Sequence, residues 1–393
     1  MLASKFNWAL MLKLSGIKSL MKNGMKVFYS LFLATTLTIL GGSVLMAKTN
    51  VNDRSIRVPA EWEPQDAVWL QWPGHLEKSY ERAFAEFSNI IVQYEKLHIL
   101  YRSKKIGTQA RSALSEVGGD PNHKNIVWHM VPSDSVWMRD NGPVYLIENG
   151  SLRIQDWNFN AWGGAFGENT PFAQDDQIPK KVGRYLGIPV DQVDIVHERG
   201  NLEFNGAGTV ILNWSTLGDP KRNPGYTRDQ AKADLKNLFG VSEVIFIEGV
   251  PEGDLTGGHI DGIARFINKS TVVVAQCTDG SKCKVDDSAT GAVLENAAQI
   301  IANAGLTVIR EPIETFVKYK GQLFDTNYMN WIVGDGYVIA TGFGDTTADA
   351  NAKARLQSYF PGRDIYVIEM LESWAQGGGV HCHTNDQPSI SQN

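Results

Sequence analysis

The segment GGGVHCHTNDQP, residues 377–388, places Cys382 between two histidines and shortly after three glycines. The chain of 393 residues has only three cysteines. A thiolate is a strong nucleophile, and a histidine close to it can move protons during covalent catalysis. A free cysteine is also among the most frequently buried residue types, where it behaves as a small apolar side chain. The segment alone therefore leaves two interpretations open, a catalytic thiol and an inert buried one.

Two further segments carry residues that could take part in the same chemistry. WMRDNGP contains Asp140 at an expected strand boundary, and DLTGGHIDGIARF places His259 and Asp261 two residues apart after a glycine pair. Residues two apart on an extended segment project from the same face, so we expect His259 and Asp261 to line one site. Each also has an ordinary structural interpretation, Asp140 as a turn cap and His259 as a hydrogen-bonded imidazole.

The four residues are more informative together than singly. Cysteine with histidine suits nucleophilic catalysis, in which the imidazole shuttles protons. A cysteine protease needs one polar residue to orient its histidine, whereas a planar cation presents N–H groups that pair with carboxylates in a bidentate manner. The two aspartates therefore indicate that Cys382 attacks the carbon of a guanidinium group.

Seven motifs occur in order from about Glu61 to Pro388: EWEPQDAVWLQWP, WMRDNGP, NFNAWGG, RNPG, GGHIDGIARF, NYMNW and GGGVHC. Together they resemble the agmatine deiminase and bacterial (Porphyromonas-type) peptidylarginine deiminase family, within the guanidine-modifying superfamily. Any one motif would be weak evidence, but the ordered set is highly specific. The resemblance implies a five-bladed pseudo-symmetric α/β propeller of the pentein type, with the active site in its central channel.

The same resemblance implies roles for individual residues. Cys382 matches the family's nucleophile and His259 its general acid and base. Asp140 and Asp261 match the carboxylates that bind the guanidinium, and Asn330, in NYMNW, matches an asparagine beside the active site. Neither a metal nor a cofactor is expected.

Three more residues are expected to contact the substrate. Gly378 is the middle of three glycines, which let the backbone approach a flat substrate and adopt turn conformations closed to other residues. Trp137 and Trp162 are candidates for the wall or aromatic cage of a cation site. Tryptophans also fill protein cores, so their types alone do not decide between these roles.

The expected reaction is hydrolytic deimination through a covalent thiouronium. Cys382 attacks the guanidinium carbon, His259 protonates the departing ammonia, and water activated by His259 hydrolyses the adduct to a ureido product. A free cysteine with a pKa near ~8.5 is mostly protonated at neutral pH, so the cationic substrate or an imidazolium has to favour the thiolate. Agmatine, giving N-carbamoylputrescine, is the first expected substrate, and peptidylarginine, giving citrulline, is the alternative.

The chain departs from the family's pattern at positions that we expect near the substrate's tail. It reads ERGN from Glu198 where two glycines commonly follow the glutamate, Asn213 and Trp214 replace a Thr-Glu pair, and Gly257 replaces an aspartate.

Two other classes of function stay open: a non-catalytic periplasmic protein that binds cationic amines, and an amidinotransferase or cysteine amide hydrolase. The oligomeric state also stays open, a homo-oligomer included.

An α/β protein must position these residues, because short runs rich in Val, Ile and aromatic residues alternate with amphipathic helical segments. Strands are predicted at 67–73, 97–103, 125–132, 143–150, 193–200, 209–214, 243–249, 270–276, 306–312, 337–344 and 364–370. Helices are predicted at 78–97, 227–239, 289–304 and 348–359, and Thr227 with Gln230 forms a capping-box pattern. No linker or charge block interrupts the chain after residue 51, so residues 48–393 are predicted to form a single catalytic domain.

The composition is that of an ordinary globular protein, with 43% hydrophobic and 20% charged residues. The net charge is −6 and no long run of Lys or Arg occurs. Proteins that bind nucleic acid usually carry a basic patch, so nucleic acid is not an expected partner. The mildly acidic balance is compatible with a small cationic guanidino substrate.

Residues 1–47 are predicted to contain a signal peptide. Lys22 and Lys26 precede the apolar run Val27–Ala47, and polar sequence follows it. Residues 1–20 precede a complete signal and are interpreted as an extension from an upstream start codon or as a longer n-region. We expect an exported protein, periplasmic or secreted, with no stable membrane association after cleavage. The alternative is an uncleaved anchor, since the run is long enough to span a bilayer.

Export would also affect the other two cysteines. Cys277 and Cys283 lie six residues apart in a turn-rich segment, and in an oxidising compartment they could pair across a hairpin. Cys382 would then remain as the odd thiol, which in an exported protein marks a candidate reactive group. No CxxC motif or histidine cluster supports a metal site.

Overall fold

One strand pattern recurs in the computed structural model, which describes residues 55–278, 283 and 289–390. In five sheets of the described chain, an antiparallel pair of strands is followed by a strand that pairs in parallel with its second member. A parallel neighbour can only be reached by a crossover connection, which is usually a helix. The repeat therefore explains the strand and helix alternation that the sequence predicts.

The five sheets are formed by strands from the whole described chain. The strands of the first sheet, in spatial order, are β19 (Thr384–Pro388), β2 (Gln65–Gln71), β3 (Lys96–Tyr101) and β4 (Ile126–Met130). Those of the second sheet are β1 (Ile56–Arg57), β5 (Val144–Glu148), β6 (Ser151–Asn158) and β7 (Val190–Val196). The other three are β8 (Glu203–Phe204), β9 (Thr209–Asn213), β10 (Glu243–Ile247); β11 (Ala264–Asn268), β12 (Thr271–Cys277), β13 (Thr307–Ile313); and β16 (Trp331–Gly334), β17 (Tyr337–Gly342), β18 (Asp364–Glu369). A separate hairpin consists of β14 (Phe316–Tyr319) and β15 (Gln322–Asp325).

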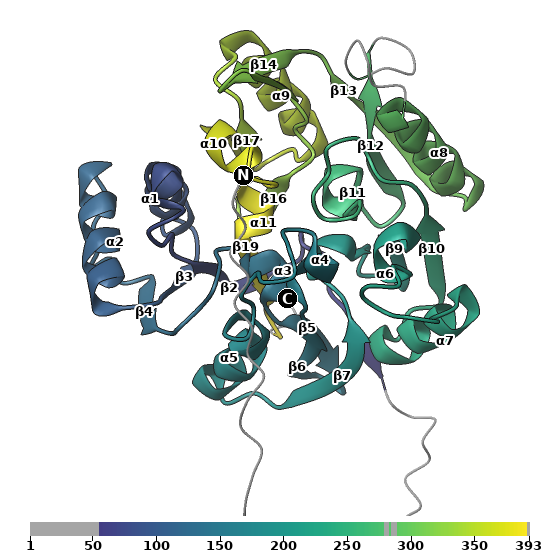
Figure 1. Cartoon of the computed structure of the whole chain (residues 1–393), viewed down its shortest axis with the longest axis horizontal. Helices are drawn as coiled ribbons and strands as arrows, with labels where there is room; N and C mark the ends of the chain where they lie inside the picture. The colour runs from purple at the N-terminus through teal and green to yellow at the C-terminus, as the bar shows by residue number, and fades with distance from the viewer. Residues whose placement is uncertain (1–54, 279–282, 284–288, 391–393) are drawn as a thin grey trace, which may run out of the picture. The chain divides into compact units, whose positions relative to one another are not determined.

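The crossover helices lie at the periphery, and shorter helices lie nearer the centre (Figure 1). The crossovers are α1 (Glu81–Ile91), α2 (Lys104–Glu116), α5 (Ile178–Leu186), α7 (Arg228–Phe239), α8 (Ala289–Asn303) and α9 (Thr346–Tyr359). The short helices are α3 (Met138–Asn141), α4 (Ala161–Gly164), α6 (Trp214–Leu217), α10 (Leu371–Trp374) and α11 (Val380–His383). The described ranges also contain the 3-10 turns η2 (Lys78–Tyr80), η3 (Asp175–Gln177), η4 (Arg199–Asn201) and η5 (Ile260–Gly262).

All eleven strands predicted from the sequence are present, within a few residues at each end. The predicted capping box also forms, since the Thr227 side chain accepts from the Gln230 N–H and the Gln230 side chain accepts from the Thr227 N–H. The helix predicted at 78–97 is wrong at its end, because α1 stops at Ile91 and β3 begins at Lys96. Neither Gly nor Pro lies between them, so no local signal marks where the helix ends.

Helices α2 and α5, the five short helices and several strands were not predicted. Ser103 is the N-cap of helix α2, and its hydroxyl accepts a hydrogen bond from the Ile106 N–H. Gly187, with φ of 66°, is the C-cap of helix α5. Both caps are recognisable signals for helix boundaries. Strands β6, β11, β16 and β19 are the antiparallel partners or first strands of their sheets. The sequences of β6, β11 and β19 carry polar residues at buried positions, which obscures the apolar pattern of a strand. Strand β16 is instead a run of only four residues, WIVG.

The described residues belong to one compact unit within residues 51–393. No helix in this part of the chain is long and apolar enough to cross a membrane. The predicted signal region lies outside the described residues, so the boundary at residue 48 stays a prediction. The predicted pairing of Cys277, at the end of β12, with Cys283 is confirmed as a disulfide.

Candidate active site

Each of the five sheets brings one segment to the candidate site. Asp140 precedes β5, Asp261 precedes β11, Asn330 precedes β16 and Cys382 precedes β19. Glu198 precedes β8 by a few residues and completes the set. Because the strand pattern repeats, equivalent positions in the five repeats come together although they are far apart in the sequence. The site residues are therefore positioned by the repeat itself.

Asn330 holds the segment that carries Cys382. Its amide nitrogen lies 3.2 Å from Cys382 Sγ, and its carbonyl oxygen accepts from the Gly379 and His381 N–H groups, each at 3.1 Å. The thiol also lies 3.6 Å from Asp261 Oδ2. Burial and the charges of Asp261 and Asp140 raise the pKa of Cys382 well above its ordinary value. In the substrate-free site the group is therefore a neutral thiol.

Gly378 is required by close packing. A Cβ atom at this position would lie 2.7 Å from both Cys382 Sγ and Trp137 Cζ3. Its neighbour Gly377 has φ of 118°, a backbone conformation that L side chains rarely adopt. Gly378 thus allows Cys382 to lie close to Trp137, and Gly377 allows the backbone to adopt a turn with positive φ.

His259 lies between two carboxylates. Its Nδ1 is 3.5 Å from Asp140 Oδ1, and its Nε2 is 3.3 Å from Glu198 Oε2. Burial alone would lower the pKa of His259, but Asp140, Glu198 and Asp261 outweigh it and raise the pKa to about 9. His259 is therefore an imidazolium at neutral pH, ready to donate a proton.

Glu198 is a site residue that the sequence interpretation missed. It is fully buried, and Arg222 Nε donates to both its oxygens at 3.0 and 3.1 Å. Burial alone would raise the pKa of Glu198, but Arg222 and His259 lower it to about 2. Its carboxylate is thus permanently ionised and orients His259. The available signal was the motif ERGN, which we discussed only as a departure from the family pattern.

One carboxylate oxygen of Asp140 accepts a hydrogen bond, and the other accepts none from the described residues. Trp162 Nε1 donates to Oδ2 at 2.8 Å. Within the described part of the chain, Oδ1 has no hydrogen-bond partner, and neither has His259 Nδ1. A Cβ at Gly200 would come within 2.5 Å of that oxygen and 2.6 Å of that nitrogen. Glycine therefore keeps open the space that both unpaired atoms face.

Burial has a large effect on Asp140 itself. Burial raises the pKa of Asp140 to about 6, and the charge of His259 acts in the opposite direction. An unpaired carboxylate oxygen in a buried site is costly unless a donor reaches it. A cationic N–H donor from a ligand would remove this cost.

Asp261 is fixed on the other side of the nucleophile. Its Oδ2 accepts from Asn330 Nδ2 at 3.2 Å and lies 2.8 Å from His381 Nδ1. The second ring nitrogen of His381 lies 3.0 Å from Glu61 Oε2, which also accepts from Arg265 at 2.9 Å. Burial alone would raise the pKa of Asp261, but His381, His259 and Arg265 lower it. Asp261 is therefore a carboxylate anchored by a buried chain of partners.

The two predicted tryptophans lie beside the site. Trp137 and Trp162 meet edge to face with ring centroids 6.4 Å apart, and Trp137 stacks on His383 at 4.4 Å. Trp162 has φ of 56° and ψ of 41°, a left-handed conformation that is uncommon for a bulky residue. This backbone conformation accompanies the hydrogen bond from its indole to Asp140. The tryptophans thus form a wall and hold a carboxylate.

The sequence interpretation was wrong about the local backbone of the site. His259 is extended, but Asp261 lies in the 3-10 turn η5, so the two residues do not share the face of an extended segment. Asp140 and Cys382 lie in the four-residue helices α3 and α11 and not in loops. The residues nevertheless line one site, because the turn and the short helices lead into the first strands of their sheets.

The departures from the family pattern have structural contacts. Arg199 pairs with Asp386 at 2.8 Å, and the Asn213 side chain accepts from the Ser215 N–H at the start of α6. Gly257 has φ of 87° and Trp214 packs against Phe246. These contacts explain the residues without a substrate. Their expected place near the substrate's tail stays a prediction.

Known proteins share this sequence and fold. The model of the Porphyromonas-type peptidyl-arginine deiminase family matches residues 57–388. The agmatine deiminase of Stutzerimonas stutzeri is 29% identical over 84% of this chain and 95% of its own, and that of Pseudomonas aeruginosa is 27% identical over 85% and 95%. A solved structure of the agmatine deiminase of Enterococcus faecalis matches with a TM-score of 0.75 at 25% identity, covering 86% of this chain and 96% of that one. The chain therefore belongs to the Porphyromonas-type peptidyl-arginine deiminase family.

Proposed function

We propose that the protein hydrolyses the C–N bond of a guanidino substrate, most directly agmatine, to give N-carbamoylputrescine and ammonia. The observation that carries this proposal is a pair of buried atoms, Asp140 Oδ1 and His259 Nδ1, which lie 3.5 Å apart and have no hydrogen bond to a described residue. A Cβ at position 200 would come within 2.5 Å of the first atom and 2.6 Å of the second, so glycine leaves room beside both. A planar cation with several N–H donors suits that space.

The two aspartates would bind the guanidinium from opposite sides. Asp261 is ionised and anchored, and Asp140 offers an oxygen that has no donor among the described residues. Hydrogen bonds between charged partners are about twice as strong as neutral ones. A bound cation would also stabilise the thiolate of Cys382 against the two carboxylates that disfavour it. Substrate binding and nucleophile formation are therefore coupled.

The reaction follows from the protonation states of the free site. The Cys382 thiol releases its proton to solvent as the cation binds, and the thiolate attacks the guanidinium carbon to form a tetrahedral adduct. The His259 imidazolium gives its proton to the departing nitrogen, which leaves as ammonia and forms a thiouronium. Neutral His259 then takes a proton from water as its oxygen attacks the same carbon. Collapse of this adduct releases the ureido product, and the hydroxyl proton passes to the departing sulfur, which restores the Cys382 thiol and the His259 imidazolium.

The five repeats support a finer description of the fold. We propose that the sheets are the blades of a five-bladed propeller and that the site lies in its central channel. The recurring strand pattern supports this arrangement, as does the origin of one site segment from each sheet. Export after removal of residues 1–47 is also part of the proposal and rests on the sequence alone.

Agmatine is favoured over the other substrate classes. The relatives from Stutzerimonas stutzeri and Pseudomonas aeruginosa are named agmatine deiminases, and this chain covers nearly all of their length. A protein that only binds amines would need the carboxylates but not the thiol and imidazolium between them. Peptidylarginine, which the family name includes, is the second candidate.

The test is a direct comparison of substrates. Purified protein is incubated with agmatine, with arginine and with a peptide that contains arginine, and ammonia and the ureido product are quantified together. We expect equal amounts of both products from agmatine, and none with Cys382→Ser. Turnover of no guanidino compound by a folded protein, or transfer of the amidino group to an added amine, would overturn the proposal.

A further inference from the structure

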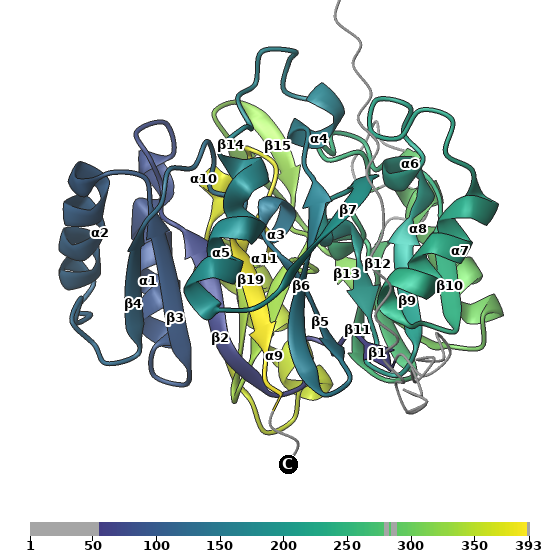
Figure 2. The ribbon, with the colours of Figure 1, turned by 90° about the horizontal axis from the view of Figure 1, so that it is seen from below.

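The motif RNPG, residues 222–225, has no part in the reaction proposed for the site, although its first two residues contact the segments that form it. The motif lies in the loop between α6 and α7, and Figure 2 shows α6 at the same end of the domain as α4, which carries Trp162. The Asn223 side chain accepts from the Val196 N–H at 3.0 Å and donates to the Val196 carbonyl at 2.8 Å, at the end of β7. Glu198 follows two residues later. The motif therefore fixes the backbone that leads to Glu198.

Arg222 is buried and holds two segments of the site at once. Its Nε donates to both carboxylate oxygens of Glu198. Its Nη2 donates to the Thr256 carbonyl at 2.6 Å, and its Nη1 donates to Asp219 Oδ2 at 3.0 Å. The Thr256 hydroxyl in turn accepts from the His259 N–H at 3.0 Å. One guanidinium thus connects the carboxylate beside the imidazole with the loop that carries the imidazole.

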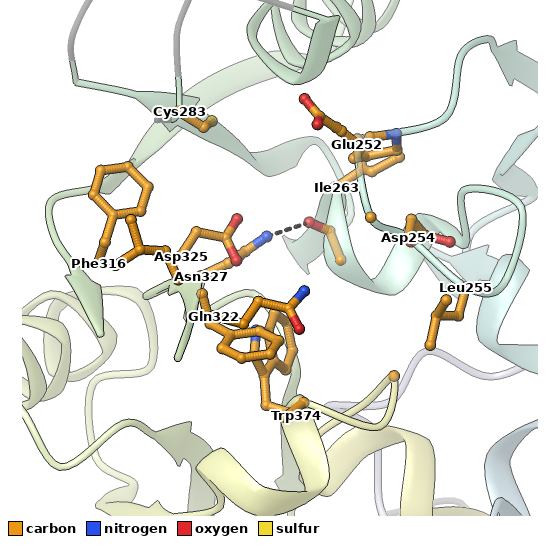
Figure 3. Close-up of a pocket in the computed structure, with 17 residues that line it drawn as sticks. Glu252, Asp254, Leu255, Ile263, Cys283, Phe316, Gln322, Asp325, Asn327 and Trp374 are labelled. Carbon is orange, nitrogen blue, oxygen red and sulfur yellow. Dashed lines mark hydrogen bonds between the residues drawn. The ribbon is translucent and has the colours of Figure 1, made fainter. Parts of the chain in front are cut away.

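The loop that leads to His259 is fixed from a second side as well. Asp254, on the wall of the pocket in Figure 3, accepts from the N–H and from the hydroxyl of Thr256, each at 2.7 Å. Gly257 has φ of 87°, and a Cβ there would lie 3.3 Å from Arg222 Nη1. A side chain at this position would therefore crowd the guanidinium. The loop is thus shaped by its own turn and by the close approach of Arg222.

Arg222 also changes the charge that His259 meets. The charged groups around the imidazole come from four described segments: Asp140 on α3, Glu198 before η4, Asp261 on η5, and Arg222 beside Glu198. Burial lowers the pKa of the neighbouring His197 to about 3, so this ring is neutral. A cation bound to a carboxylate offsets part of the charge that the carboxylate exerts on its other neighbours. Arg222 therefore keeps Glu198 ionised and limits how strongly Glu198 favours the imidazolium.

We propose that Arg222 is a positioning residue, which places His259 through Glu198 and Thr256 and sets its acidity by sharing the charge of Glu198. The proposal rests on the deiminase function proposed above, in which His259 is the acid. Loss of the Glu198 charge should make His259 a stronger acid, and loss of the Arg222 charge should make it a weaker one. Lysine cannot replace the planar fork, because a single ammonium group does not reach three partners with the same geometry.

The experiment separates charge from geometry with two variants, Arg222→Gln and Arg222→Lys. The kcat and KM for agmatine are measured as a function of pH, and the pKa of His259 is measured by NMR of substrate-free protein with labelled histidines. In Arg222→Gln, the pKa of His259 and the alkaline limb of kcat/KM should both rise by about one unit, because the charge of Glu198 then acts on His259 alone. At neutral pH, kcat should fall at least about tenfold, because a misplaced acid slows the chemistry. KM should change less than about threefold, because the aspartates that bind the guanidinium are intact.

The lysine variant and a control complete the comparison. Arg222→Lys keeps the charge, so the pKa of His259 should stay within about half a unit of wild type, while kcat still falls at least about tenfold. Arg355→Gln is the matched control, since this partly buried arginine pairs with Glu311 and Glu314 in another part of the chain. The control should leave kcat, the alkaline limb and the pKa of His259 unchanged.

The outcomes separate the role of Arg222 from the deiminase function. A pKa of His259 that stays the same or falls in Arg222→Gln overturns the proposal, because a contact that is only structural would loosen the carboxylates that raise this pKa. A wild-type kcat in Arg222→Lys overturns it as well, and this result decides if Arg222→Gln does not fold. The NMR titration needs no turnover, so it tests Arg222 independently. If wild-type protein turns over no guanidino compound, the deiminase function itself fails.

Discussion

Replacing Glu198 by Gln tests whether His259 is a general acid whose charge is held by buried carboxylates. Glu198 Oε2 lies 3.3 Å from His259 Nε2, and both side chains are buried. Two unit charges at this distance attract by about 5 kcal/mol at an effective dielectric constant of about 20. Arg222 lies 3.0 Å from the same carboxylate and neutralises part of its charge. We therefore assign about half of this energy or less to the interaction between Glu198 and His259. Glutamine keeps the shape and removes the charge.

The expected result is a shift in the pH dependence of turnover. One pH unit corresponds to about 1.4 kcal/mol, so a loss of about 1.5 to 2.5 kcal/mol lowers the pKa of His259 by about one to two units. The pKa of His259 is raised to about 9 in the native site, so the acid form is present below that pH and is lost as pH rises through it. In the variant the alkaline limb of kcat/KM should therefore fall below about pH 8.

The assay is ammonia release from agmatine between pH 6 and pH 11, because kcat/KM reports the ionisations of the free enzyme. Glu311→Gln is the matched control, since this buried carboxylate is paired with Arg355 in another part of the chain. This control variant should show the alkaline limb of kcat/KM at the same pH as the wild-type protein. An alkaline limb that stays near pH 9 in a folded Glu198→Gln protein would refute the assignment of His259 as the acid.

Three further predictions follow from the same geometry. Cys382→Ser should abolish turnover while its circular dichroism and melting temperature stay close to those of wild type, because the site has no base to ionise a serine hydroxyl; measurable ammonia release would contradict this. Asp140→Asn and Asp261→Asn should each lower kcat/KM by at least about a hundredfold, since removing one partner of a buried ion pair costs about 3–5 kcal/mol; a loss below tenfold at both would place them outside the guanidinium site. The intact mass of the exported protein should correspond to a chain that begins near Lys48, and a mass that retains the N-terminal apolar run would disprove cleavage.

The sequence predicted which residues come together at the site better than the interactions that tune them. Cys382, His259 and the two aspartates stand in ordered motifs, and their types alone indicate chemistry on a guanidinium. The pairing of His381 with Glu61 joins residues 320 positions apart, and no local pattern shows such a contact. The partnership between His259 and Glu198 likewise depends on the packing of two different sheets.

The strands likewise fall into those that the sequence predicted and those that it did not. Strands with continuous apolar runs, such as β12 and β17, were predicted, because burial on both faces leaves a strong signal. Strand β19 was not, because its sequence TNDQP is polar although all five of its residues are buried. Its side chains serve the polar centre, where Asp386 pairs with Arg139 at 2.6 Å. Polar side chains that serve the site can therefore hide a strand from the hydrophobic pattern.

The most direct test of covalent deimination is peptide mapping by mass spectrometry after acid quench of the enzyme during turnover of agmatine. The proposed mechanism predicts that the peptide that contains Cys382 gains the mass of agmatine less one ammonia, and that the adduct disappears when the substrate is exhausted. Steady turnover without such an adduct, or an adduct on a different residue, would contradict the central role of Cys382.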